Sequence, residues 1–386
     1  MSIAASAIRI VRAESAFLFG AATTVVFYAL GEALVGGLGA NVRTAVLFVW
    51  LFGAMLWCAF GVVRHADCLA ELLGEPYGTL ILTLSVIGIE VSLIASIMLH
   101  GENEPALARD TMFAVLMIVL NGMVGIALIL GAIRHREQHY NLQGAKAFLA
   151  VIIPLSALTL ILPNFTRSTR GPTFSPFQAA FFAVATIVLY GVFLVIQTAR
   201  HSGHFLQPGE RSRSAHRVAD PLAADESGRE SGQHEVHSVP YHAILLFLTI
   251  LPVVLLSKKL ALFVDLLTET MGAPAALGGL VIAILVLSPE GLSALRAALG
   301  NRLQRSVNIL LGSALATIGL TVPAVLAIGL ITGRTIELGL APVELLMLVL
   351  TLAVCSLTFS GGRTNVLQGA VHVVLFIAYV VLIFNP

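Results

Sequence analysis

The sequence predicts an all-α membrane protein of about eleven transmembrane helices, built as an N-terminal helix followed by two inverted five-helix repeats. Three observations support this. The 386 residues are 58% apolar and 11% charged, whereas soluble domains are about a quarter charged. The charged residues cluster between apolar stretches. The length of these stretches is close to the roughly 20 residues that a helix needs to cross a bilayer. Two of those stretches carry a glutamate at a matching place, Glu90 and Glu290.

The predicted spans follow the apolar stretches in order. They lie at residues 17–38, 43–63, 76–99, 109–132, 145–163, 176–197, 241–264, 273–297, 305–332, 341–359 and 365–384. The first stretch is too long for the apolar region of a signal peptide, so we expect an uncleaved span. Lys258 and Lys259 interrupt the seventh stretch, and the sequence leaves open whether they lie inside that helix or at its end.

The distribution of basic residues predicts the orientation. With the N-terminus in the cytoplasm, fifteen of the 22 Lys and Arg residues fall in cytoplasmic segments and seven in external ones. Because cytoplasmic loops are enriched in Lys and Arg, we expect the N-terminus inside and the C-terminus outside a cytoplasmic (inner) membrane. The hydrophilic stretch between the sixth and seventh spans supplies five of the fifteen.

Four segments follow from this pattern. Residues 1–41 hold the first span, 42–197 the first five-helix repeat, 198–240 a disordered cytoplasmic linker that contains histidines, and 241–386 the second repeat. The histidine spacings in the linker match no compact metal site, and the three cysteines show no CxxC spacing. Because each repeat has an odd number of spans, the two repeats face opposite ways, as in inverted-repeat transporters.

Local sequence similarity supports the repeat. GTLILTLSVIGIE (residues 78–90) aligns without gaps on GGLVIAILVLSPE (residues 278–290), and both end in glutamate. In the spans that follow, Asn121 falls opposite Thr317. FQAA at 177–180 is echoed by LQGA at 367–370.

Glu90 and Glu290 are the strongest functional candidates. A charged side chain in the middle of a membrane helix costs about 2.5–3.5 kcal/mol on insertion scales, and such residues usually mark ion pathways. Neither has a basic residue one helical turn away. Each is therefore expected to hold a proton, bind a cation or face a wet cavity. Since protons and a cation exclude one another from a carboxylate, the pair indicates a cation/proton antiporter.

The surrounding residues favour an oxygen-rich site. Pro289 removes one helical hydrogen bond immediately before Glu290, which frees a carbonyl oxygen of the kind that hard cations prefer. Further oxygen ligands are predicted from neighbouring positions of the central spans: Asn121, Asn308, Ser313 and Thr317. Glu75 is expected at the cytoplasmic entrance to the site. Arg64, His65 and Asp67 are interpreted as a solvated helix end, and a pairing of Glu344 with His372 is left open.

Two strings resemble a known family. GEPYGT (residues 74–79) and SPEGLSALRAA (residues 288–298), within the longer matches at 70–96 and 277–329, resemble the ChaA-type bacterial Ca2+/H+ antiporters of the calcium/cation antiporter superfamily. The resemblance covers most of the chain. It implies eleven spans with one essential acid in each repeat, carried here to Glu90 and Glu290. The first repeat departs from the GNxxE-like motif of the broader family, so Glu75 remains an alternative to Glu90.

The predicted activity is exchange of cytoplasmic Ca2+ for protons, because two carboxylates balance a divalent ion. Exchange of Na+ or K+ for protons is the alternative, since the same branch resembles such exchangers. An intramembrane enzyme is a remote alternative, because HExxH and GxSxG are absent. No cofactor is expected. The predicted partners are membrane lipid, inorganic cations and protons. A net charge of +1 argues against nucleic acid, and no oligomeric state is predicted.

Overall fold

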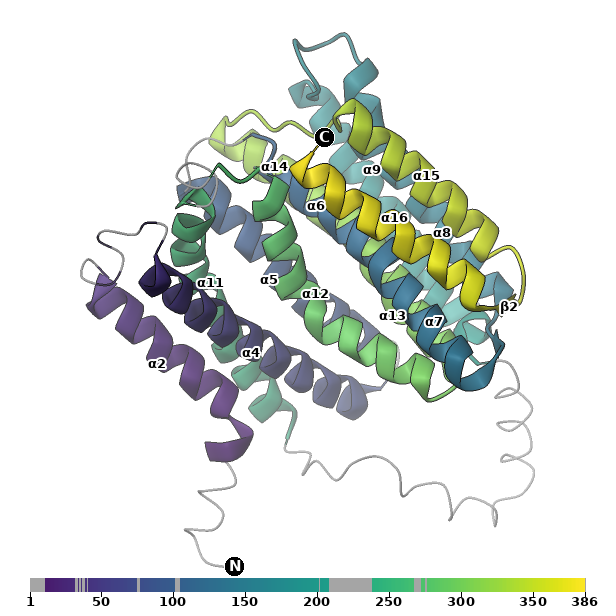
Figure 1. Cartoon of the computed structure of the whole chain (residues 1–386), viewed down its shortest axis with the longest axis horizontal. Helices are drawn as coiled ribbons and strands as arrows, with labels where there is room; N and C mark the ends of the chain where they lie inside the picture. Colours follow the sequence, from purple (N-terminus) through teal and green to yellow (C-terminus); the bar gives the residue numbers. More distant parts are fainter. Residues whose placement is uncertain are drawn as a thin grey trace, which may run out of the picture.

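The chain folds into a helical bundle, seen in a computed structural model that describes residues 11–31, 34, 36, 39, 41–74, 77–100, 105–200, 202–207, 238–266, 272–274 and 276–385 (Figure 1). The elements of its first half are α2 (Ser15–Ala29), α4 (Val42–Leu73), α5 (Tyr77–His100), α6 (Leu107–Met117), η1 (Ile118–Met123), α7 (Val124–His135), β1 (Gln138–His139), α8 (Leu142–Ser156), η2 (Ala157–Ile161), η3 (Leu162–Phe165), α9 (Pro176–Val195), η4 (Ile196–Arg200) and η5 (Ser202–Phe205). Those of its second half are α11 (Val239–Asp265), α12 (Ala276–Leu299), α13 (Leu303–Ala316), η8 (Thr317–Thr321), α14 (Val322–Thr332), α15 (Pro342–Thr358), β2 (Arg363–Thr364) and α16 (Val366–Phe384).

The helices have the length and composition of membrane spans. Within the described residues, eight continuous helical segments are long and apolar enough to cross a bilayer. Three further apolar helices are shorter, at Ser15–Ala29, Thr83–Ser96 and Pro342–Thr358. Each of the eleven predicted apolar stretches overlaps one of these segments. The protein is therefore a multi-pass membrane protein, as the sequence predicts.

α5 and α12 lie between two packed groups of helices (Figure 1). One apolar core is formed with α2, α4 and α11, and the other with α6 to α9 and α13 to α16. α5 contributes Ile89 to the first core and Ile87 to the second, and α12 likewise contributes Leu285 and Leu287. These two helices carry Glu90 and Glu290. The fold therefore places both acids at the boundary between the two groups.

A π-helix interrupts each of the two most buried long helices. α6 and α7 are joined through η1, and α13 and α14 through η8. A π-helix inserts one extra residue into the helical repeat and is frequent at functional sites. Thr317 is the first residue of η8, and Asn121 lies within η1.

Two glycines allow α7 and α16 to cross in close contact. A Cβ atom on Gly125 would lie 2.9 Å from the Gly369 carbonyl oxygen and 2.8 Å from a methyl group of Val373. A Cβ atom on Gly369 would lie 2.8 Å from the Gly125 carbonyl oxygen. Small residues at such crossings let membrane helices approach closely.

The predicted linker begins with ordered structure. Residues 202–205 form a short 3-10 helix, η5, and Phe205 packs edge-on against Phe148 at a centroid distance of 5.4 Å. The rest of that segment, residues 208–237, lies outside the described residues. Lys258 and Lys259 lie within α11, which continues to Asp265. The Lys259 ammonium lies over the ring of Tyr28, 5.0 Å from its centroid, which gives this charge an aromatic partner on α2.

Candidate functional site

Glu90 is buried in the middle of α5. Its side chain is 1% exposed, and the Thr317 hydroxyl donates a hydrogen bond of 3.0 Å to Glu90 Oε2. Its second oxygen, Oε1, has no hydrogen-bond partner among the described residues. A buried carboxyl oxygen without a partner is costly. Glu90 therefore retains capacity for a proton or a cation.

Glu290 lies on α12, immediately after Pro289. Because proline lacks an N–H, the carbonyl of Leu285 loses its partner in the helix. Ser313 of α13 faces the Glu290 carboxyl, whose Oε2 has no hydrogen-bond partner within the described part of the chain. The charge of Glu290 acts on Glu90, so the two carboxyls lie within electrostatic reach of each other.

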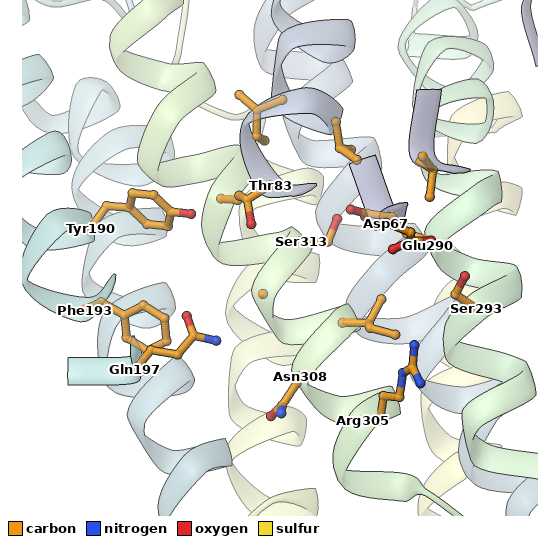
Figure 2. Close-up of a pocket in the computed structure, with 16 residues that line it drawn as sticks. Asp67, Thr83, Tyr190, Phe193, Gln197, Glu290, Ser293, Arg305, Asn308 and Ser313 are labelled. Atoms are coloured by element: carbon orange, nitrogen blue, oxygen red, sulfur yellow. The ribbon is translucent and has the colours of Figure 1, made fainter. Parts of the chain in front are cut away.

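A cavity of about 330 Å³ reaches Glu290 (Figure 2). It is lined by residues of α4, α5, α9, η4, α12 and α13, among them Asp67, Thr83, Tyr190, Gln197, Glu290, Ser293, Arg305, Asn308 and Ser313. Asp67 and Arg305 are exposed, whereas Glu290 is only partly so. Glu90 is not one of the lining residues. The cavity therefore gives Glu290 direct access to solvent, whereas Glu90 is buried away from its lining.

The structure brings together part of the predicted oxygen set. Thr317 contacts Glu90, and Ser313 faces Glu290. Asn308 lines the cavity, but its amide is engaged: Nδ2 donates 2.7 Å to the carbonyl of Phe205, and Oδ1 accepts 2.7 Å from Gln304. Its role in this conformation is to fasten η5 to α13. Glu75 lies outside the described residues.

Asn121 forms hydrogen bonds with residues of α15 and α16 instead of with the glutamates. Its Nδ2 donates 2.8 Å to the Thr351 hydroxyl, and its Oδ1 lies 3.2 Å from His372 Nδ1. His372 Nε2 lies 2.9 Å from the Thr358 hydroxyl. This buried network ties η1 to α15 and α16. Its hydrogen bonds direct the Asn121 amide toward those helices rather than toward either glutamate.

Glu344 and His372, whose pairing the sequence left undecided, do not pair with each other. The Glu344 carboxylate instead accepts a 3.0 Å hydrogen bond from the backbone N–H of Ala341, at the start of α15. A carboxylate at this position satisfies an otherwise free N–H group of the first helical turn. His372 is held in the network with Asn121.

The interpretation of His65 as part of a solvated helix end is wrong. Its side chain is 1% exposed, with Nε2 3.0 Å from Glu14 Oε2 and Nδ1 3.0 Å from His242 Nδ1. Arg64 donates 2.8 Å to the same Glu14 oxygen, and Tyr241 donates 2.8 Å to the other. The cluster joins the residues before α2 to α4 and α11. It is buried because α11 packs along α4.

Sequence reasoning missed several lining residues. Asp67 was placed in the solvated end after a span that stops at residue 63, but α4 continues to Leu73. The continued apolar spacing of Val62, Ala66 and Leu69 was the available signal, and all three side chains are buried. Arg305 is the first residue of a predicted span, and the sequence alone indicates no further role for it. Tyr190 had no local signal, because its place in the cavity depends on how α9 packs.

Comparison with known proteins gives one family. Residues 43–199 and 241–385 match the sodium/calcium exchanger protein family. The chain is 40% identical over 384 residues to the sodium-potassium/proton antiporter ChaA of Escherichia coli (strain K12), which covers 100% of both chains. It is 25% identical over 276 residues to a Ca(2+)/H(+) antiporter of Aphanothece halophytica, covering 68% of this chain and 70% of that protein.

A solved structure shares the fold. Native YfkE matches with a TM-score of 0.71 at 17% sequence identity, over 96% of this chain and 100% of that one. The family match spans most of the chain, and the similarity to the E. coli protein is full length. The resemblance inferred from GEPYGT and SPEGLSALRAA is thus confirmed. The chain belongs to the sodium/calcium exchanger family, and it is a membrane transporter rather than an enzyme.

Proposed function

We propose that this protein exchanges a monovalent cation, Na+ or K+, for protons at a site formed by Glu90 and Glu290. The observation that carries the proposal is the pair of carboxyls on α5 and α12, which interact electrostatically and each have one oxygen that lacks a partner among the described residues. An ionised carboxylate in a low-dielectric interior needs a compensating charge. A proton and a cation each supply that charge, and each excludes the other.

Two observations favour a monovalent ion. The relative that is 40% identical over its full length is named a sodium-potassium/proton antiporter. The cavity that leads to Glu290 also contains Arg305, whose positive charge offsets the attraction of Asp67, which would be stronger for a divalent ion than for a monovalent one.

Ca2+ is the second candidate. Two carboxylates balance its charge, and the Ser313 and Thr317 hydroxyls are oxygen donors of the kind that it prefers. The more distant relative from Aphanothece halophytica is named a Ca(2+)/H(+) antiporter. Exchange with each ion separates the two candidates.

The proposed architecture has eleven spans with two inverted five-helix repeats. It is supported by α5 and α12, which each carry a glutamate, and by η1 and η8, which interrupt the next long helix in each half. The charge distribution supports a cytoplasmic N-terminus in the inner membrane. In this orientation the cavity opens toward the cytoplasm, because Arg305 lies at the end of α13 that follows the cytoplasmic loop after α12.

Exchange in proteoliposomes tests the proposal. Vesicles that contain the purified protein and an internal pH dye receive Na+, K+ or Ca2+ in turn. The expected result is cation-dependent proton movement with Na+ or K+, which Glu90→Gln and Glu290→Gln each abolish. Glu137→Gln is the matched control, since Glu137 forms an exposed ion pair with Arg363 and does not line the cavity.

The possible outcomes distinguish exchange of a monovalent ion from exchange of Ca2+, and an effect on the site from an effect on the fold. Movement driven only by Ca2+ would select the second candidate. Undiminished exchange in either site variant would remove that glutamate from the mechanism. Loss of exchange in Glu137→Gln as well would show that the variants disturb the fold rather than the site.

A further inference from the structure

The cavity contains a charge pattern that the two glutamates alone do not explain. Three of the described residues that line it have a carboxyl or guanidinium group: Asp67 of α4, Glu290 of α12 and Arg305 of α13 (Figure 2). Asp67 and Arg305 are both exposed to solvent, whereas Glu290 is only partly exposed. A cation that approaches Glu290 from solvent through this cavity therefore passes Asp67 and Arg305.

These charges act on one another in sequence. Arg305 interacts electrostatically with Asp67, and Asp67 interacts with Glu290. Asp67 attracts an approaching cation, and Arg305 repels it. Since the Coulomb energy is proportional to the charge of the ion, a divalent cation experiences twice the effect of a monovalent one. The balance between Asp67 and Arg305 therefore changes the ratio of divalent to monovalent affinity.

We propose that Asp67 and Arg305 form a charge pair in the cavity that controls the ratio of divalent to monovalent affinity, in which Arg305 offsets the stronger attraction that Asp67 exerts on divalent ions. The inference rests on the proposed function, because it concerns which ion reaches Glu290. Neither residue needs to bind the transported ion. The pair acts on the ion through its electric field, and the net charge of the pair is zero while both members are present.

The test measures exchange in proteoliposomes as a function of cation concentration, with K+ and Ca2+ used separately and with Ca2+ also added as a competitor of K+ exchange. The variants are Arg305→Gln, Asp67→Asn and the double variant. Arg305→Lys preserves the charge. Arg302→Gln is the matched control, because Arg302 is also exposed and lies one helical turn before Arg305 but does not line the cavity.

A unit charge several ångströms from the ion changes its affinity by roughly tenfold per unit of ion charge. Arg305→Gln is therefore expected to lower the ratio of the KM for Ca2+ to the KM for K+ by about tenfold. If Ca2+ inhibits K+ exchange but is not itself transported, the ratio of the Ca2+ inhibition constant to the KM for K+ is expected to fall by about the same factor. Asp67→Asn is expected to shift the ratio by about tenfold the other way. The double variant and Arg305→Lys are expected to return within about threefold of the wild type.

Two results would overturn the inference while leaving the proposed function intact. One is an Arg305→Gln ratio that differs from wild type no more than that of Arg302→Gln. The other is a double variant that retains the full shift of a single variant, since a field effect must cancel when both charges are removed. Wild-type protein that moves no protons with any of the cations would overturn the inference together with the proposed function.

Discussion

Replacing Thr317 by valine removes the hydroxyl that donates to Glu90 while it keeps the shape of the side chain. The donor and acceptor are 3.0 Å apart and both residues are 1% exposed, so water cannot readily replace the bond. A hydrogen bond to a charged group contributes about 1.5–3 kcal/mol. The bond is stronger to the ionised carboxylate that binds a cation than to the protonated acid. The cation KM is therefore expected to rise by roughly 10- to 100-fold.

The assay is cation-driven proton movement in proteoliposomes, with Thr317→Ser as the conservative variant. Thr159→Val is the control, because Thr159 is also buried in a π-helix but its hydroxyl bonds back to the carbonyl of Leu155 at 2.7 Å. We expect Thr317→Ser to keep the KM near that of the wild type. A Thr317→Val protein with the same KM as Thr159→Val would refute a role for this bond in cation binding.

Two further predictions concern the fold. Gly125→Ala is expected to lower stability by about 1–3 kcal/mol, because the new methyl group would overlap Val373 and the Gly369 carbonyl. Gly312→Ala is the control: its Cβ would meet Phe148 at 3.7 Å, so the Tm in detergent should be unchanged. Equal Tm values for the two variants would contradict the close crossing of α7 and α16. Burial raises the pKa of Tyr140, which lies between α7 and α8, to about 12, so the wild type is expected to lose stability as pH rises from about 10, the pKa of an exposed tyrosine, through 12. Alkaline unfolding of Tyr140→Phe should lack that loss, and an identical pH dependence would contradict it.

The sequence was sufficient to find the helices and the two central acids. Apolar stretches about as long as a bilayer is thick determine where helices form, and this signal is local. Glu90 and Glu290 were conspicuous because a charged residue inside an apolar stretch is expensive. Thr317 and Ser313 were predicted because their hydroxyl oxygens lie on one of the central spans, the one that follows Glu290.

The rest of the site depends on packing between distant segments. His65 meets His242 across 177 positions, and Asn121 meets His372 across 251. No local pattern predicts such pairs, because they depend on how α11 packs on α4 and α16 on α7. Asp67 and Arg305 look like ordinary charges at helix ends in the sequence. Only the arrangement of α4, α12 and α13 places them in one cavity with Glu290.

The most direct test of the central claim is proton release on cation binding, measured with purified protein in weakly buffered detergent solution over a series of pH values. If protons and the cation compete for Glu90 and Glu290, adding Na+ or K+ must release protons from the wild type, and Glu90→Gln and Glu290→Gln must each release fewer. Glu137→Gln is expected to match the wild type. Saturable cation binding without proton release, or full release in both site variants, would contradict the account.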